Sequence, residues 1–224
     1  MSGTEPPALW PLMERVGARY AAAPAWSRGF VRGKLLTDPV TPALLRLAAA
    51  SGGLGSLVDL GCGRGQTGIA LLLAGLAGEV TGLDLDPAKI RDATEAAQGL
   101  PARFAVADLS VADVPEADTA MMLDVLLQME AAAQLPLLRR IAAAARRRVL
   151  IRAFDPAAGW RAALGSAMEE AGRRIRRDGS HFRPMALEAL AAPFREAGFR
   201  VQVAPCWGWT PLPNVLLVAE RGDS

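Results

Sequence analysis

Lysine is nearly absent from this chain, and histidine, cysteine and tyrosine are scarce. Only Lys34 and Lys89 among the 25 basic residues are lysines, and the chain has one histidine, one tyrosine and two cysteines. A single histidine and two distant cysteines cannot supply the ligand spacing of a metal site. Cys62 and Cys206 lie far apart in the sequence, so we expect neither a disulfide bond nor a metal.

Long apolar runs and an excess of one charge are missing as well. No segment approaches the roughly eighteen uninterrupted apolar residues of a membrane span. Glu5, Pro6 and Pro7 stand where a signal peptide would need a basic start and an apolar run. The formal net charge of +2 gives no case for a nucleic-acid partner. With 51% hydrophobic and 21% charged residues in 224, we expect one sizeable α/β domain of a cytoplasmic enzyme.

Short apolar runs alternate with helical stretches from about residue 55 onward. The predicted strands are Ser56–Leu60, Glu79–Asp84, Ala102–Ala107, Asp118–Leu123 and Arg148–Ala153. The predicted helices between them are Gln66–Ala77, Pro87–Gln98 and Glu130–Ala145. This alternation indicates five parallel strands with helices on both faces. No helix fits between Phe199–Ala204 and Asn214–Glu220, so these two strands should close the sheet as an antiparallel hairpin.

Two regions fall outside this alternation. Residues 1–50 form a predicted N-terminal helical extension, with helices at Leu9–Tyr20, Ala25–Leu35 and Pro39–Ala50. Residues 51–224 form the main domain, in which 155–185 is an insertion with a helix at Pro156–Arg176. Ligands of open α/β sheets bind at the carboxyl ends of the strands. Both regions can reach that edge, so we expect them to form a lid and an acceptor pocket.

The most informative stretch runs from Val58 to Gly65, where an acid and three alternating glycines follow a strand. Glycine permits a tight turn and a close approach to a ligand. Asp84 ends the next strand, as in a βαβ unit that binds a nucleoside. A dinucleotide fingerprint would need glycine at position 66, where Gln66 stands, and Asp59 would repel a phosphate. The pattern therefore favours a nucleoside with a cationic amino-acid tail.

These residues resemble the first motif of the class I S-adenosylmethionine-dependent methyltransferases, (D/E)-x-G-x-G-x-G. The resemblance extends over nearly the whole chain from about residue 55. It implies a Rossmann-like, doubly wound α/β sheet of seven strands, with S-adenosyl-L-methionine as cofactor and S-adenosyl-L-homocysteine as product. The cofactor-binding residues that it implies are Asp59, Gly61, Cys62, Gly63, Gly65, Asp84, Leu85, Asp108, Leu109 and Asp124.

The resemblance also implies roles for several of these side chains. Asp59 would orient the ammonium group, and Asp84 would accept both ribose hydroxyls. Leu85 would flank the adenine. Asp108 would accept from the adenine amino group, although a helix N-cap is the alternative. Asp124, after the fourth predicted strand, would contact the cofactor or act on the acceptor, or else cap a short helical turn.

The acceptor side of the site carries weaker signals. Candidate bases are His181, Asp124 and Tyr20, although a lone loop histidine is more often surface. Six aromatic residues fall in the regions placed near the acceptor and either line an apolar slot or pack the extension: Trp10, Tyr20, Trp26, Phe30, Trp207 and Trp209. Arg28, Arg32 and Lys34 either receive an acidic or carrier-bound acceptor or form a solvated helix face.

We therefore expect a small, apolar or aromatic methyl acceptor. The run from Arg32 to Pro39 is loosely similar to bacterial methyltransferases of lipid or polyketide-type pathways. The Asn/Asp-Pro-Pro-Tyr/Phe motif of amino-group methylases is missing after the fourth predicted strand, which disfavours nucleic acid as acceptor. Two alternatives remain, a nicotinamide-dependent oxidoreductase and a non-catalytic nucleoside-binding module. The oligomeric state is open.

Overall fold

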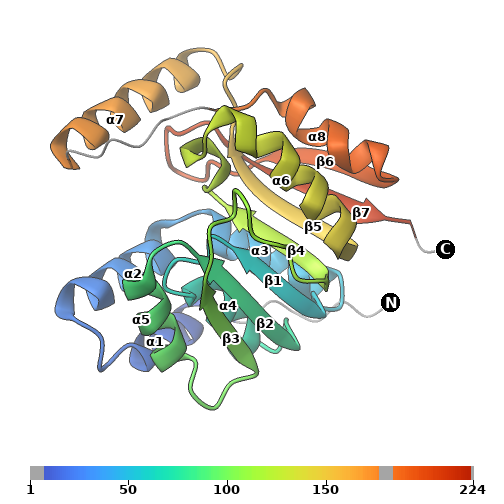
Figure 1. Ribbon diagram of the computed structural model, residues 1–224. Helices are drawn as coiled ribbons and strands as arrows, with labels where there is room; N and C mark the ends of the chain where they lie inside the picture. The colour runs from blue at the N-terminus through green and yellow to red at the C-terminus, as the bar shows by residue number, and fades with distance from the viewer. Residues whose placement is uncertain (1–7, 177–183, 223–224) are drawn as a thin grey trace.

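The computed structural model describes residues 8–176 and 184–222, and they form one twisted sheet with helices on both faces (Figure 1). The helices are α1 (Leu9–Arg19), α2 (Ala25–Thr37), α3 (Val40–Ala50), α4 (Gln66–Leu73), α5 (Pro87–Ala96), the short 3₁₀ helix η1 (Leu126–Gln128), α6 (Ala131–Ala144), α7 (Trp160–Arg176) and α8 (Leu187–Glu196). The strands are β1 (Ser56–Leu60), β2 (Glu79–Asp84), β3 (Ala102–Val106), β4 (Ala117–Leu123), β5 (Ala145–Phe154), β6 (Phe199–Pro205) and β7 (Asn214–Arg221).

The sheet has the order β3-β2-β1-β4-β5-β7-β6. Strands β1 to β5 pair in parallel, whereas β7 is antiparallel to both β5 and β6. The strand order reverses direction between β1 and β4, and ligands of open α/β sheets bind at such a switch point. The predicted fold class, five parallel strands closed by an antiparallel hairpin, is confirmed.

Both faces of the sheet are buried, as the continuous apolar strands require. Neighbouring strand residues contribute to different cores: Leu57 and Met121 to the cluster under α1, α3 and α4, and Val58 and Met122 to the cluster under α6 and α8. Both methionines are buried core residues and do not line the cavities. Among the described residues, no helix is long and apolar enough to cross a membrane.

Several element boundaries differ from those predicted. Helix α4 ends at Leu73 instead of Ala77, because Gly75 takes a positive φ of 69° and turns the chain. Helix α7 begins at Trp160, four residues later than predicted, after the turn at Asp155. Helix α8 has no counterpart in the sequence analysis. It carries Pro193 in its interior, a residue that usually argues against a helix.

Candidate cofactor and acceptor site

The turn between β1 and α4 is built from the three predicted glycines. Gly61, Gly63 and Gly65 have φ values of 73°, 57° and 73°, in the left-handed region that side chains disfavour. A Cβ on Gly61 would come within 2.1 Å of Val125 Cγ2, and one on Gly65 within 2.7 Å of the Phe104 ring. The turn therefore needs glycine both for its backbone and for its packing.

Asp84 at the end of β2 is fixed beside this turn. Its Oδ2 accepts a hydrogen bond from the backbone N–H of Gly63 at 2.8 Å, and its Oδ1 accepts from the N–H of Asp86 at 3.0 Å. The Lys89 Nζ lies 3.8 Å from Oδ1. The carboxylate is thus oriented from the glycine turn and from the start of α5. Asp86 itself caps α5 through the N–H groups of Ala88 and Lys89.

A cavity of about 610 Å³ opens at this edge of the sheet. Most of the predicted cofactor residues line it: Gly61, Gly63, Asp84, Leu85, Asp108, Leu109 and Asp124. Asp108 is exposed and its Oδ1 accepts from the Ser110 N–H at 2.9 Å; its hydrogen bonds with Ser110 hold the pKa of its carboxyl below the ordinary value. Because Asp108 stands in a turn outside any helix, it is not a helix N-cap.

Asp59 and Gln66 lie in a smaller pocket of about 100 Å³ that adjoins the first at Gly61 and Gly63. Asp59 is 2% exposed, and among the described residues it has no ion-pair partner. Burial, and secondarily the negative charge of Asp84, raise the pKa of Asp59 to about 7. Gln66 Oε1 is also buried and has no hydrogen-bond donor in the described chain. Both groups are therefore buried acceptors that receive no hydrogen bond from the described residues.

Cys62 and Gly65, two further predicted cofactor residues, have different positions relative to the small pocket. Cys62 lines the small pocket, but its Sγ packs toward β2, where a Cβ on Gly82 would meet it at 2.9 Å. Burial raises the pKa of the Cys62 thiol, so it stays protonated. Gly65 lines neither cavity and holds the left-handed position before α4. Both cysteines are free and buried.

Residues of the N-terminal helices contact the glycine turn at Arg64. The Tyr20 hydroxyl donates to the Arg64 carbonyl at 2.6 Å, and the Arg64 Nε donates to Asp92 Oδ2 at 2.9 Å. The Arg64 guanidinium lies 4.6 Å from the Trp26 ring centroid and 5.5 Å from that of Phe30. Sequence reasoning missed Arg64, although its place between two motif glycines was a signal.

This placement argues against Tyr20 as a base. Its side chain is 1% exposed, its hydroxyl is committed to a backbone carbonyl, and it lines neither cavity. Burial, foremost, raises the pKa of the Tyr20 phenol far above its ordinary value. Its role in the structure is to hold the turn.

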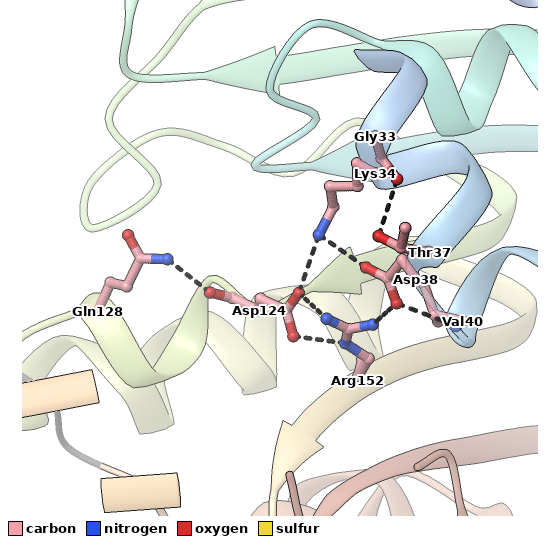
Figure 2. Close-up of polar contacts among 8 residues, drawn as sticks. All are labelled: Gly33, Lys34, Thr37, Asp38, Val40, Asp124, Gln128 and Arg152. Atoms are coloured by element: carbon pink, nitrogen blue, oxygen red, sulfur yellow. Dashed lines mark hydrogen bonds and ion pairs between the residues drawn. The ribbon is translucent and has the colours of Figure 1, made fainter. Parts of the chain in front are cut away.

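Asp124 belongs to a cluster of two acids and two cations (Figure 2). Arg152 on β5 donates from Nε to Asp124 Oδ1 at 2.6 Å and from Nη2 to Oδ2, and its Nη1 binds Asp38. Lys34 on α2 lies 2.9 Å from Asp38 and 3.4 Å from Asp124. Burial raises the pKa of Asp38, but the charges of Lys34 and Arg152 outweigh it and leave that pKa below its ordinary value.

The backbone of Asp124 is also unusual. With φ of 62° it is the one non-glycine residue of positive φ in the described ranges, and such strain collects at functional sites. Its side chain does not cap η1, because the cluster holds both carboxylate oxygens. Its carbonyl instead accepts from Gln128 Nε2 at 2.8 Å.

The structure does not bring the remaining predicted acceptor-site residues together at one place. His181 lies outside the described residues. Trp10 lines a separate groove between α1 and α2, and Trp209 lines another beside Pro39. Trp207 packs against Arg161 of α7 at 4.3 Å from its ring centroid. Of the six aromatic residues, only Phe30 lines the cofactor-side pockets.

The strand order, the glycine turn and the acid at the end of β2 define the class I S-adenosylmethionine-dependent methyltransferase architecture. A family profile described as "Methyltransferase domain" matches residues 57–148. The matched residues run from β1 to β5, the part of the chain that holds the glycine turn and Asp84. A search of curated proteins finds no significant match.

Solved structures agree with this assignment. Magnesium protoporphyrin IX methyltransferase from Synechocystis PCC 6803, with bound S-adenosylhomocysteine, is 19% identical with a TM-score of 0.64, over 93% of this chain and 94% of that one. An O-methyltransferase family protein from Burkholderia thailandensis is 17% identical with a TM-score of 0.61, over 96% and 69%. The [4+2]-cyclase SpnF is 17% identical with a TM-score of 0.61, over 83% and 80%. These structures confirm the predicted fold, and the profile match agrees with the predicted family. The Synechocystis enzyme has also been solved with bound S-adenosylmethionine.

Proposed function

We propose that this protein transfers the methyl group of S-adenosylmethionine to a small-molecule acceptor. The observation that carries the proposal is the pair of buried acceptors, Asp59 and Gln66 Oε1, at the closed end of the site. An ammonium group has three N–H donors and a positive charge, which suits both. A dinucleotide pyrophosphate offers only acceptors and negative charge, so it would give neither Asp59 nor Gln66 Oε1 a donor, which disfavours the nicotinamide alternative.

In this proposal, different residues bind different parts of the cofactor. Asp84 accepts hydroxyl hydrogen bonds at the ribose position, Asp108 accepts at the adenine end, and Leu85 forms an apolar wall. When bound, the cofactor supplies a methyl group on a sulfonium, whose positive charge is lost during transfer. Leu123, Val125 and Met129 line the same cavity and keep water away, which favours a step that disperses charge.

Asp124 acts as an orienting group in this proposal and not as a base. Arg152 and Lys34 already contact both oxygens of its carboxylate, which fixes the orientation of the group. His181 remains a predicted base of the acceptor side. Positioning by the cavity walls supplies part of the roughly 7–11 kcal/mol that proximity can contribute.

The acceptor we propose is small and apolar or aromatic. It would enter between α2 and η1, where Phe30, Val125 and Met129 line the two cavities. In this proposal α2 is the lid over the cofactor. Arg28 and Arg32 line the separate groove between α1 and α2 and therefore do not contribute to this opening.

Binding and turnover need separate tests, because one fold can host several chemistries and a [4+2]-cyclase shares this one. By calorimetry, S-adenosylhomocysteine should bind with an affinity on the order of micromolar, and NAD should not bind. Tritium transfer from methyl-labelled cofactor to a cell extract then tests catalysis. Binding of NAD would refute the cofactor assignment, and binding without transfer would favour a non-catalytic module.

A further inference from the structure

A further cavity lies between α1 and α2, apart from the cofactor site. It has a volume of about 440 Å³, within the range of small-molecule pockets. Residues between Trp10 and Ala18 of α1 and between Arg28 and Leu36 of α2 line this α1–α2 groove. It shares no lining residue with the two cavities at the glycine turn. The methyl transfer proposed for this protein therefore makes no use of it.

Much of the groove is apolar. Met13 and Leu35, one from each helix, are buried and form its floor, whereas Trp10 and Leu36 are exposed at its rim. The Trp10 Nε1 donates to Glu14 Oε1 at 3.0 Å, which fixes the indole one turn away along α1. Exposed apolar surface that lines a groove is typical of a binding site. An indole and a methionine side chain are both favourable partners for an aromatic ring.

Gly17 leaves room in this groove. A Cβ on Gly17 would have no neighbour within 4 Å, and its φ is not positive. Glycine inside a helix is less stable than alanine, and neither the backbone nor the packing requires it here. The open space beside Gly17 lets a flat ring approach the backbone of α1 closely.

The charged residues of the groove are divided between its two sides. Glu14 stands on α1, and Arg28 and Arg32 stand on α2. The Arg28 Nη1 donates to the Ala23 carbonyl at 2.9 Å, whereas Arg32 has no hydrogen-bond or ion-pair partner within residues 8–176 and 184–222. A free guanidinium suits a carboxylate, whose two oxygens match its planar donors. Glu14 on the other helix disfavours a second negative charge on the ligand.

We propose that the α1–α2 groove binds a small aromatic monocarboxylic acid. Arg32 binds the carboxylate, and the ring lies over Met13 and Gly17 beside the Trp10 indole. The site is independent of the proposed function, because a ligand in this groove contacts none of the residues that line the cofactor cavities.

Calorimetry with 2-naphthoate and its neutral analogue 2-naphthamide tests the role of the charge. The wild-type protein should bind 2-naphthoate with a dissociation constant on the order of 100 micromolar. It should bind the amide about 10- to 100-fold more weakly, the range for a hydrogen bond to a charged group. Arg32→Met should remove this preference. Arg91→Met removes an exposed positive charge from α5 instead and should retain it.

A pair of glycine substitutions tests the position of the site. Gly17→Leu places a side chain in the groove and should weaken both probes by more than about tenfold, the value of a lost apolar contact of this size. Gly29→Leu is the matched control, because Gly29 of α2 also has open space around it but does not line the groove. It should leave both affinities unchanged, and circular dichroism checks that both variants keep their helices.

Several results would overturn the proposal. Equal binding of the two probes by the wild-type protein would exclude recognition of the carboxylate. Unchanged binding by Gly17→Leu, or displacement of 2-naphthoate by S-adenosylhomocysteine, would place the probe outside the α1–α2 groove. If 2-naphthoate does not bind and Gly17→Leu converts a wild-type dimer to a monomer in sedimentation, the groove holds a second copy of this chain and not an acid.

Discussion

Replacing Asp59 with asparagine should raise the free energy of unfolding of the protein and lower its affinity for the cofactor. Asp59 is buried without a cation, and its pKa of about 7 stands well above the ordinary 3.8. The folded protein therefore binds the proton more tightly than the unfolded chain, and stability falls as pH rises between these two values. Above pH 7 the ionised group costs about 4 kcal/mol, since each pKa unit corresponds to about 1.4 kcal/mol.

Asparagine has nearly the same shape and does not ionise, so Asp59→Asn removes this cost. In urea unfolding we expect a gain of up to about 4 kcal/mol at about pH 8, and of only about 2 kcal/mol at about pH 5.5, where the wild-type group is mostly protonated. The affinity for S-adenosylhomocysteine should fall by about 10- to 100-fold at the higher pH. A stability difference that does not change with pH would refute the argument that Asp59 is a buried, unpaired carboxylate.

Three further substitutions test separate parts of the site. Asp84→Ala should cost about 1.5–3 kcal/mol of S-adenosylhomocysteine binding in calorimetry, and unchanged affinity would remove Asp84 from the ribose position. Gly61→Ala should lower the free energy of unfolding by about 1–3 kcal/mol, since its Cβ meets Val125 at 2.1 Å and its φ is positive; an unchanged thermal midpoint would contradict the close packing. Arg152→Leu should cost about 3–5 kcal/mol of stability in urea unfolding because two carboxylates lose their guanidinium. A small loss there would mean that Lys34 neutralises both acids alone.

The sheet was predictable because its signals are local. Strands Ser56–Leu60 and Glu79–Asp84 are observed with the predicted bounds, since each has an apolar centre and is closed by a glycine that follows it or by an acid at its end. The glycine turn was equally readable, because positive φ restricts the residue type directly. Helix α8 escaped prediction because Pro193 sits inside it, and packing of Leu190 and Phe194 into the core outweighs that local cost.

The polar parts of the site depend on contacts across long sequence distances. Arg152 meets Asp38 across 114 positions and Asp124 across 28, which no local pattern encodes. Tyr20 looked like a candidate base because of its chemistry, but burial against the Arg64 carbonyl decides its role.

Under the proposed function, these contacts make the N-terminal helices part of the cofactor site. Tyr20 and Trp26 hold the glycine turn through Arg64, and Lys34 brings a charge to the pocket that contains Asp59. The methyltransferase profile begins at residue 57, so Tyr20 and Trp26 reach the glycine turn from outside the matched sequence. A buried carboxylate with a raised pKa is costly in the free protein, and an ammonium ligand removes that cost. Cofactor binding should therefore release a proton from Asp59 below about pH 7, and calorimetry in buffers of different ionisation enthalpy would measure that release.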